Sequence, residues 1–354
     1  MADLSSRKAD HLELATRGDV AFHETTTLFD DVRLVHDALP ELDCDAIDTS
    51  CRVLGKRLRA PLLIAAMTGG TARAQDINRE LASIAEERGY AFGLGSQRAM
   101  HKDRASRVTY AVRDLAPEAL VLGNVGLVQA RAMSSLELAE LVESVGADAL
   151  CVHLNPAMEV VQPEGDRDFQ GGLETLARLV GELPVPIVVK ETGCGLSSGV
   201  ARRVRSVGVR HVDVSGAGGT SWVAVEMHRA EAGHKALGEV FREWGIPTAA
   251  SVALVAPHGF ETIFATGGMK SGLDVAKAIA LGASAGGLAR PVLQALERGG
   301  RAGALELLER VEAELRTTML LVGAAELAGL RAAPRIIRGE LSEWIALSGK
   351  RPAG

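Results

Sequence analysis

The sequence predicts a (β/α)8 barrel, also called a TIM barrel, with an N-terminal extension and a long C-terminal helix. Three observations predict this α/β fold. Eight short apolar segments alternate with amphipathic ones, the apolar segments are continuous rather than alternating, and polar or glycine-rich residues follow each of them. Continuous apolar runs are typical of parallel strands that are buried on both faces. Eight such strands are the number that closes a barrel.

The predicted strands are four or five residues long and consist mainly of Ala, Val, Ile and Leu. Aromatic residues make up only 3% of the chain, and barrel interiors are filled mainly by branched aliphatic side chains, so the composition agrees with a barrel core. The predicted strands span residues 62–66, 91–94, 120–123, 149–153, 187–190, 211–214, 262–265 and 285–289.

Between these strands, apolar residues recur at helical spacing. In residues 76–88 they lie three or four positions apart, and Gly89 follows as a typical C-terminal stop. Ser134 and Glu137 have the spacing of a capping box, which predicts that a helix begins after Ser134. Strands and helices therefore alternate along the chain, as a (β/α)8 barrel requires.

Two regions of different character are predicted from this pattern. Residues 1–60 come before the first strand and helix unit, and we expect them to form an extension that covers the active site. Residues 61–354 form the barrel, and a long final helix is expected over residues 302–330.

Charge and cysteine patterns argue against several classes of protein. The net charge is −6 and no basic stripe indicates nucleic-acid binding. No segment approaches the roughly 18–20 apolar residues that span a bilayer, and the polar N-terminus lacks an apolar signal core. We therefore expect a cytoplasmic protein without a membrane partner. The cysteines form no CxxC pair and no zinc-like cluster with histidines; they are Cys44, Cys51, Cys151 and Cys194.

Polar and glycine-rich residues follow every predicted strand, at the end where a barrel builds its active site. After the last two strands, Gly267-Gly268 and Gly287-Leu288-Ala289 would leave backbone N–H groups free at the starts of helices, where barrels commonly bind phosphate. The phosphate could belong to FMN, to a substrate or to both. Taken singly, a glycine pair can be a turn, His153 a core histidine and Lys190 a salt-bridge partner. Their occurrence at all eight strand ends favours an active site.

Several longer motifs occur in one order along nearly the whole chain. They are Arg7-Lys8 with His11, residues 66–70 and 93–98, His153-Leu154-Asn155 followed by Glu159, residues 163–167, Lys190-Glu191, and residues 213–222, 244–248 and 267–278. In these motifs the chain resembles the type 2 isopentenyl-diphosphate isomerases, a family of flavin-dependent barrel enzymes.

The resemblance implies an activity and its cofactors. Members of this family interconvert isopentenyl diphosphate and dimethylallyl diphosphate by a 1,3-allylic proton shift. They use FMN in its reduced state, NADPH or NADH as the reductant, and Mg²⁺, and they are usually tetramers or octamers. The barrel of residues 61–354 would then bind FMN, and the protein would form a homo-oligomer.

The resemblance also implies roles for individual residues. The expected FMN-binding residues are Met67, Thr68, Gly69, Ser96, Asn124, Lys190, Ser215, Thr220, Gly267, Gly268, Leu288 and Ala289. The expected substrate-binding residues are Arg7, Lys8, Ser96, Gln97, Arg98 and Asn155. His153, Lys190 and Met158 are expected in the catalytic centre, with His153 also near the diphosphate, and Glu159 is the expected Mg²⁺ ligand.

Physical chemistry agrees with these roles. A diphosphate carries several negative charges, and arginine side chains together with a metal ion can compensate them. The proton shift passes through a tertiary cation or a species close to it, which needs an acid, a base and a nearby negative charge in a dry pocket. A reduced flavin can provide all three. A charged Lys190 that faces the flavin ring would favour its anionic form.

One position departs from the family pattern in a way that affects the chemistry. Met158 stands where the family normally has Gln, close to the reacting carbons. Methionine fills a similar volume but cannot relay a proton. Either the flavin carries the proton and the chain is a slower isomerase, or it is a paralogue with an altered prenyl-diphosphate substrate or reaction. Lys270 in place of the family's usual Arg is a milder departure.

Two other classes of function remain open. A flavin oxidoreductase of the hydroxy-acid-oxidase type would share the barrel and the phosphate site. That chemistry needs a His–Arg pair late in the barrel, whereas His211 starts a strand and His258 has no evident Arg partner. A non-catalytic protein that binds flavin or prenyl diphosphate is the other alternative, and Met158 is the only residue that favours it.

Overall fold

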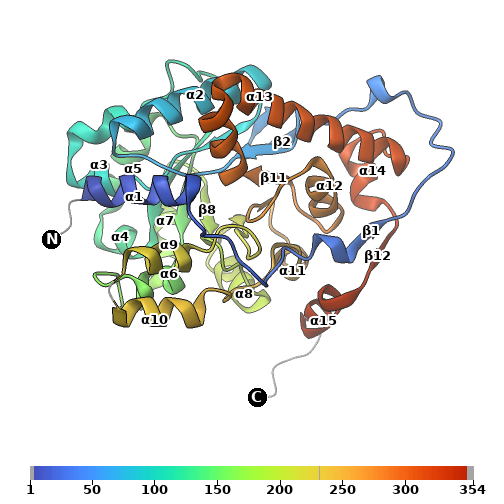
Figure 1. Ribbon diagram of the computed structural model, residues 1–354. Coiled ribbons are helices and arrows are strands. Elements are labelled where there is room, and N and C mark those ends of the chain that lie inside the picture. Colours follow the sequence, from blue (N-terminus) through green and yellow to red (C-terminus); the bar gives the residue numbers. More distant parts are fainter. Residues whose placement is uncertain (1–3, 231, 349–354) are drawn as a thin grey trace.

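In the computed structural model, which describes residues 4–230 and 232–348, eight parallel strands close into a barrel (Figure 1). The barrel strands are β4 (Leu62–Ile64), β5 (Ala91–Gly93), β6 (Leu120–Gly126), β7 (Ala149–His153), β8 (Ile187–Lys190), β9 (His211–Asp213), β10 (Thr262–Ala265) and β11 (Ala285–Leu288). They are hydrogen-bonded in chain order, and the last strand, β11, pairs with the first, β4. The predicted fold class is therefore confirmed.

All eight strands lie where the apolar segments predicted them, and β6 differs most in length. It continues three residues beyond the predicted end, because Asn124, Val125 and Gly126 pair with residues 151–153 of β7. The Gly-Asn pair resembles the start of a turn. Pairing with a long neighbouring strand keeps it extended instead.

Helices surround the barrel and cover its ends. They are α1 (Leu4–Arg17), α2 (Ala72–Arg88), α3 (Arg98–Lys102), α4 (Leu127–Ala132), α5 (Ser135–Val145), α6 (Pro156–Val161), α7 (Gly172–Glu182), α8 (Ser198–Ser206), α9 (Trp222–Arg229), α10 (Ala232–Phe241), α11 (Thr248–Val255), α12 (Gly272–Ala280), α13 (Arg290–Leu321), α14 (Leu327–Ala332) and α15 (Gly339–Ser348). Short 3-10 helices are η1 (Phe29–Asp31), η2 (Cys44–Ala46), η3 (Arg104–Tyr110) and η4 (Ala256–His258).

The predicted helix signals are confirmed in detail. Gly89 ends α2 in the left-handed conformation with φ of 68°. Ser134 and Glu137 form the capping box of α5. Helix α2 begins four residues earlier than predicted, because the Thr71 side chain accepts a hydrogen bond from the N–H of Ala74 and caps the helix there.

The predicted bounds of the long final helix, residues 302–330, are wrong at both ends. Helix α13 begins at Arg290 and ends at Leu321, with an interruption at Gly300, where φ is 59° and ψ is −156°. Gly323 then turns the chain in the left-handed conformation. The shorter helix α14, the strand β12 (Arg335–Ile337) and α15 follow it.

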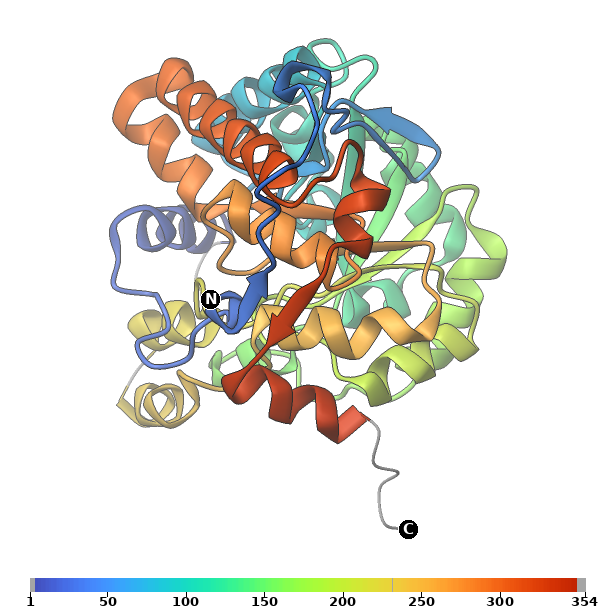
Figure 2. The ribbon, with the colours of Figure 1, turned by 90° about the vertical axis from the view of Figure 1, so that its right-hand side faces the viewer.

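The N-terminal extension packs against the barrel domain at three places, through strand β1, the β2–β3 hairpin and helix α1. Its strand β1 (Val32–Leu34) pairs antiparallel with β12, so the first and last parts of the chain lie side by side (Figure 2). Its hairpin of β2 (Cys51–Val53) and β3 (Lys56–Leu58) packs Val53 and Leu58 into the barrel interior. Helix α1 packs against α9 and α13.

The core is aliphatic, as the composition predicts. One large cluster of buried Val, Ile, Leu and Ala side chains lies between the barrel and its helices, and a second fills the barrel interior. Burial of this apolar surface is the main favourable contribution to folding. Within residues 4–230 and 232–348, no helix combines the length and the hydropathy that crossing a bilayer requires.

Candidate active site

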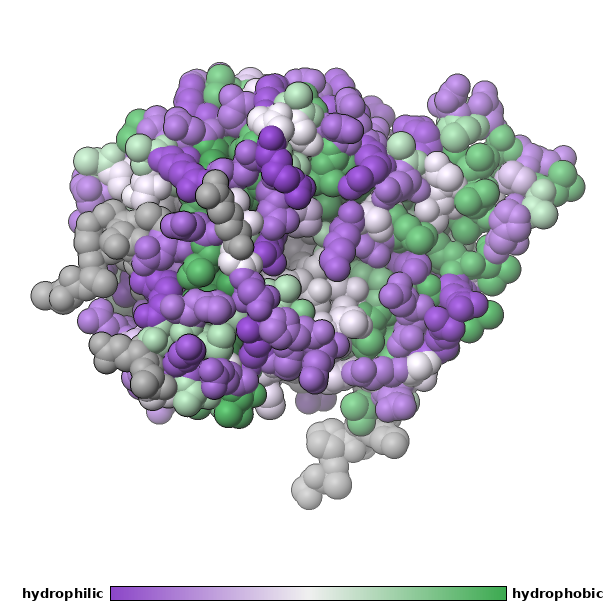
Figure 3. All heavy atoms as spheres, in the orientation of Figure 1, coloured by the Kyte–Doolittle hydropathy of each residue, from purple (hydrophilic) through white to green (hydrophobic). Residues whose placement is uncertain are grey.

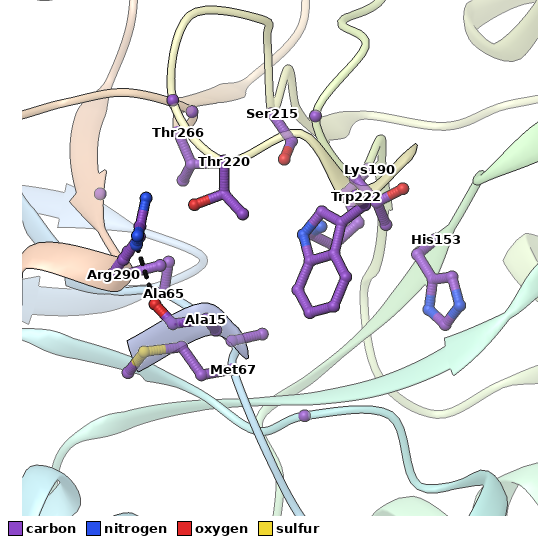
Figure 4. A pocket seen from close by; sticks show the side chains of 18 of the residues that line it. Ala15, Ala65, Met67, His153, Lys190, Ser215, Thr220, Trp222, Thr266 and Arg290 are labelled. Carbon is purple, nitrogen blue, oxygen red and sulfur yellow. Dashed lines mark hydrogen bonds between the residues drawn. The ribbon is translucent and has the colours of Figure 1, made fainter. Parts of the chain in front are cut away.

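A cavity of about 480 Å³ lies at the C-terminal ends of the strands, and residues that follow all eight strands line it. Helix α1 adds His11, Leu12 and Ala15 to the same wall, and Ala21 and Phe22 follow from the next segment. Figure 4 shows Met67 on one side of this space, opposite Thr220 and Trp222.

The surface in Figure 3 is mostly hydrophilic, with apolar side chains gathered on its right over the region of β1, β12 and α14.

Most residues that were predicted from the sequence meet at this cavity. The following line it: Met67, Thr68, Gly69, Ser96, Arg98, Asn124, His153, Asn155, Met158, Glu159, Lys190, Ser215, Thr220, Gly267, Gly268 and Ala289. The barrel topology therefore brings together residues from the C-terminal ends of all eight strands, although these residues lie far apart in sequence.

Four predicted residues do not line the cavity with a described side chain. Gln97 is fully buried behind the wall, where its Oε1 accepts from the N–H of Asn124 at 2.9 Å. Leu288 packs in the core, and only its neighbours Gly287 and Ala289 reach the cavity. Arg7 and Lys8 lie in α1, but their side chains fall outside the described residues.

Two glycine-rich loops pack backbone against backbone at one end of the cavity. Gly267 and Gly268 adopt φ of 99° and 72°, and a Cβ atom on Gly268 would contact Thr27 and the carbonyl oxygen of Gly218. Within the described part of the chain, the N–H groups of Gly267, Gly268 and Ala289 make no hydrogen bond. Helix α13 begins beside them without a side-chain cap. Free N–H groups at a helix N-terminus form a site for a phosphate.

Lys190 ends strand β8 and reaches the cavity while remaining almost completely buried. Its Nζ donates to the carbonyl oxygen of Glu191 at 2.5 Å. Two buried carboxyl groups lie near this cation. Burial raises the pKa of Asp213, against the effect of the Lys190 charge. Burial also raises the pKa of Glu191 to about 7, although backbone N–H groups from Cys194 and Thr192 stabilise its anion.

His153 ends β7 in a neutral form with a defined tautomer. The Nδ2 of Asn124 donates to the carbonyl oxygen of Leu94 at 3.1 Å, so Oδ1 of Asn124 is the atom 2.8 Å from Nδ1 of His153. A carbonyl oxygen only accepts, so Nδ1 carries the proton. Burial, with the charges of Lys190 and Arg98, lowers the pKa of His153 to about 3. Its Nε2 is therefore a hydrogen-bond acceptor.

Glu159 lies in the first turn of α6 and is only 4% exposed. One carboxylate oxygen accepts from Nδ2 of Asn155 at 2.8 Å and the other from the N–H of Asp166 at 2.9 Å. Among the described residues no Lys, Arg or His forms an ion pair with it. A buried carboxylate without a cationic partner suits a metal ion.

The described residues alone do not complete a metal site. No group of three His, Cys, Asp or Glu side chains that could hold a metal ion occurs in residues 4–230 and 232–348. Mg²⁺ is usually bound by one or two carboxylates, with water and substrate phosphate as its other ligands. A site built on Glu159 fits this pattern.

Met158 lies next to this carboxylate and faces the same cavity. Its Sδ is 3.9 Å from Nδ2 of Asn155, which is a weak contact for a thioether. The side chain therefore supplies apolar surface beside the polar end of the site.

The sequence did not single out several residues that the cavity contains. Asp213 and Trp222 lie inside a motif, and Arg290 directly follows the segment after the last strand, but none of the three had an assigned role. Gln129 gave no signal, because it lies in a helix beyond a strand end. Trp222 lies edge-to-face against His11 of α1, with ring centroids 5.6 Å apart.

Neither histidine considered for hydroxy-acid chemistry belongs to this site. His211 lies at the N-terminal end of β9, opposite the cavity. His258 contacts the hydroxyl of Ser198, with 2.9 Å between Nε2 and Oγ. The His–Arg pair of such an oxidase is therefore not supplied by these residues.

Comparisons with known proteins agree with this geometry. A family model described as FMN-dependent dehydrogenase matches residues 1–159 and 154–337. An isopentenyl-diphosphate delta-isomerase of Methanothermobacter thermautotrophicus is 45% identical over 348 residues, covering 98% of this chain and 97% of its own. One of Halobacterium salinarum is 47% identical over 348 residues, covering 96% and 95%. Among solved structures, a flavocytochrome b2 variant with sulfite bound has a TM-score of 0.69 at 19% identity, covering 97% of this chain and 86% of that one. At that identity the likeness shows the fold alone.

Proposed function

Because the chain belongs to the family of type 2 isopentenyl-diphosphate isomerases, we propose that it interconverts isopentenyl diphosphate and dimethylallyl diphosphate by a 1,3-allylic proton shift. One observation carries the proposal: a single cavity has a phosphate site of free N–H groups at one end and the buried, unpaired carboxylate of Glu159 at the other. The first suits a flavin phosphate and the second a metal-bound diphosphate.

The described residues fit FMN. The free N–H groups of Gly267, Gly268 and Ala289 would hold its phosphate. A Cβ atom at either glycine would collide with the neighbouring loop, so the loop conformation that leaves these N–H groups free requires glycine. Further residues that line the cavity would hold the remainder of the cofactor: Met67, Thr68, Gly69, Ser96, Asn124, Lys190, Ser215 and Thr220. When bound and reduced, FMN supplies acid, base and negative charge beside the substrate. Lys190 would favour the anionic form through its charge.

At the opposite end, Glu159 would bind Mg²⁺ and two side chains would hold the diphosphate. Arg98 supplies a positive charge and Asn155 an amide beside the metal ligand. Arg7 and Lys8 would add two charges from α1. His153 lies at the same end, and its bare Nε2 can accept a hydrogen bond but not donate one to a phosphate oxygen.

The walls of the cavity would keep the reaction dry. Leu12 and Phe22 from the N-terminal segment, with Trp222 and Met158 from the barrel, place apolar surface around the space between the two ends. An electron-poor intermediate is protected from water in such surroundings. This supports the role of residues 1–60 as a cover of the active site.

NADPH or NADH as the reductant, and a homo-oligomer of four or eight copies, follow from the family and complete the proposal. The described surface carries exposed apolar side chains that suit subunit contacts, among them Leu39, Val240 and Trp244. Size-exclusion chromatography of the FMN-loaded protein tests the assembly, and a monomer would refute that part.

Met158 favours a second candidate, a paralogue that keeps the same cofactors but acts on another prenyl diphosphate. The thioether enlarges the apolar part of the cavity beside Glu159 and removes a polar group there. A longer or differently branched substrate would use that apolar surface.

One experiment tests the proposed function. The FMN-loaded protein is reduced anaerobically, mixed with isopentenyl diphosphate and Mg²⁺ in D₂O, and assayed for dimethylallyl diphosphate and deuterium uptake. We expect product that depends on reduced flavin and on Mg²⁺, and its loss in Glu159→Gln. No product from the wild type refutes the isomerase, and turnover of a longer prenyl diphosphate would then establish the paralogue.

A further inference from the structure

Gln129 lies in the first turn of α4 and has no role in the proposed function, yet its side chain lines the cavity. Its Nε2 donates to Oδ2 of Asp166 at 2.7 Å. A carboxylate oxygen cannot donate, so this bond fixes the amide orientation. The Oε1 of Gln129 is consequently left as an acceptor.

Oε1 of Gln129 and Nε2 of His153 both lie close to the position that a Cβ atom of Gly126 would occupy. A Cβ atom on Gly126 would contact Oε1 of Gln129 and would lie 3.0 Å from Nε2 of His153. Only a glycine therefore leaves room for both side chains. Because Nδ1 of His153 carries the proton, Nε2 is also an acceptor.

Oε1 of Gln129 and Nε2 of His153 are two hydrogen-bond acceptors that face the same space, so a donor is expected between them. No donor group in residues 4–230 or 232–348 forms a hydrogen bond with either atom. A phosphate oxygen could not bind there directly, because it too is an acceptor and would be repelled. The missing group must bring hydrogens, and a water molecule brings two.

Asp166 connects this place to the proposed metal ligand. Its side chain holds Gln129, and its backbone N–H donates to the carboxylate of Glu159 at 2.9 Å. Mg²⁺ gives up its water ligands reluctantly and usually keeps several of them. A water molecule on the metal ion donates stronger hydrogen bonds than bulk water does.

We propose that Oε1 of Gln129 and Nε2 of His153 accept the two hydrogens of a water molecule bound to the Mg²⁺ ion of Glu159. Gln129 is then a positioning residue, which touches neither the metal ion nor the substrate carbons. This inference rests on the metal site of the proposed function. Loss of such an outer partner typically weakens metal affinity by about 10- to 100-fold.

The test is Mn²⁺ binding to the FMN-loaded protein in the presence of inorganic diphosphate, followed by electron paramagnetic resonance of the free ion. We expect Gln129→Met to raise the dissociation constant of Mn²⁺ by about tenfold or more. The FMN absorption spectrum and the midpoint of thermal unfolding should not change. If Gln129→Met unfolds, Gln129→Asn withdraws the same amide by one methylene group and should also weaken binding.

A matched control exists at the other end of the cavity. Gln294 also lines it, but its Nε2 donates to the carbonyl oxygen of Thr16 in α1. Gln294→Met makes the same chemical change and should leave Mn²⁺ affinity as in the wild type. The double variant Gln129→Met/His153→Phe should lose less Mn²⁺ binding free energy than the two single variants together, because both residues would hold the same water molecule.

Two outcomes separate this inference from the proposed function. Wild-type Mn²⁺ affinity in Gln129→Met, or strictly additive effects with His153→Phe, overturns the inference even when dimethylallyl diphosphate is formed. Weaker Mn²⁺ binding in Gln129→Met that is not additive with the effect of His153→Phe upholds it even when the wild type turns over no isopentenyl diphosphate, in which case only the proposed reaction fails.

Discussion

Replacing Arg290 with Gln tests whether α13 holds α1 over the cavity. Arg290 is the first residue of α13, and its guanidinium donates to the carbonyl oxygen of Ala15 at 2.8 Å (Figure 4). It also donates to the carbonyl oxygen of Gly18 at 2.7 Å. Carbonyl groups in the last turn of a helix have no partner within that helix. Arg290 supplies a hydrogen-bond donor for the carbonyl group of Ala15, in the last turn of α1, and for that of Gly18, which directly follows the helix.

The structure gives the size of the expected effect. A hydrogen bond from a charged group contributes about 1.5–3 kcal/mol, and the lower end applies because the guanidinium is partly exposed. Two such bonds amount to about 3 kcal/mol. Since 1.4 kcal/mol corresponds to a factor of ten, the population of undocked α1 should rise by about 100-fold in Arg290→Gln.

Hydrogen exchange of the amides in α1, followed by mass spectrometry, measures this population. Gln294→Met removes one neutral hydrogen bond, from Nε2 to the carbonyl oxygen of Thr16, and should raise exchange only about fivefold. Arg301→Gln changes the same helix at ion pairs with Glu80 and Glu87 and should leave α1 unchanged. Equal exchange of α1 in Arg290→Gln and Arg301→Gln would refute the reasoning.

Three further predictions concern the site itself. Met158→Gln should raise kcat for the formation of dimethylallyl diphosphate by about tenfold, which is less than the roughly 100-fold rate effect of a positioned acid or base. A wild type without activity, together with no gain in the variant, would contradict this prediction. Lys190→Met should lower the midpoint potential of bound FMN by about 30 mV or more in an anaerobic titration, because it removes the charge that would stabilise the anionic reduced flavin. This shift corresponds to about 1.4 kcal/mol for two electrons. An unchanged potential would exclude the proposed effect of the Lys190 charge. Burial raises the pKa of Glu191 from 4.5 to about 7, so the folded state holds this proton more tightly than the unfolded state. Its contribution to stability is therefore lost as pH rises from about 4.5 to 7, and urea unfolding of Glu191→Gln should lack that decrease.

Strand positions could be predicted from the sequence because a buried parallel strand has no polar face. For residues 149–153, 187–190 and 262–265 the predicted bounds are those of the structure, and four other strands end one or two residues before their predicted ends. At β6 the pattern failed, since the end of that strand depends on pairing with β7 rather than on its own residues. The bounds of α13 depended on Gly300 and Gly323, whose effects on a long helix are not visible in periodicity.

Site residues next to strand ends were predictable for the same reason. All strands of the barrel end at the same face, so Lys190 and His153 could be placed at the cavity without knowledge of their contacts. Gln97 shows the limit of this reasoning, because it neighbours two residues that line the cavity and itself points into the core. Gln129 shows the opposite case: its place depends on the hydrogen bond to Asp166, which sequence spacing does not contain.

The contacts of the polar side chains narrow the choice between the two interpretations of Met158. Among the described residues that line the cavity, His153 has its pKa lowered to about 3 and Glu159 accepts two hydrogen bonds beside the expected metal ion. Lys190 donates to a backbone carbonyl, and Met158 cannot carry a proton at all. None of these four has a proton that it can readily exchange with the substrate carbons, so we infer that the reduced flavin would supply the acid and the base when it is bound. Under this proposal a glutamine at position 158 would orient the substrate rather than carry its proton, and we expect its replacement by methionine to slow the isomerase without abolishing it.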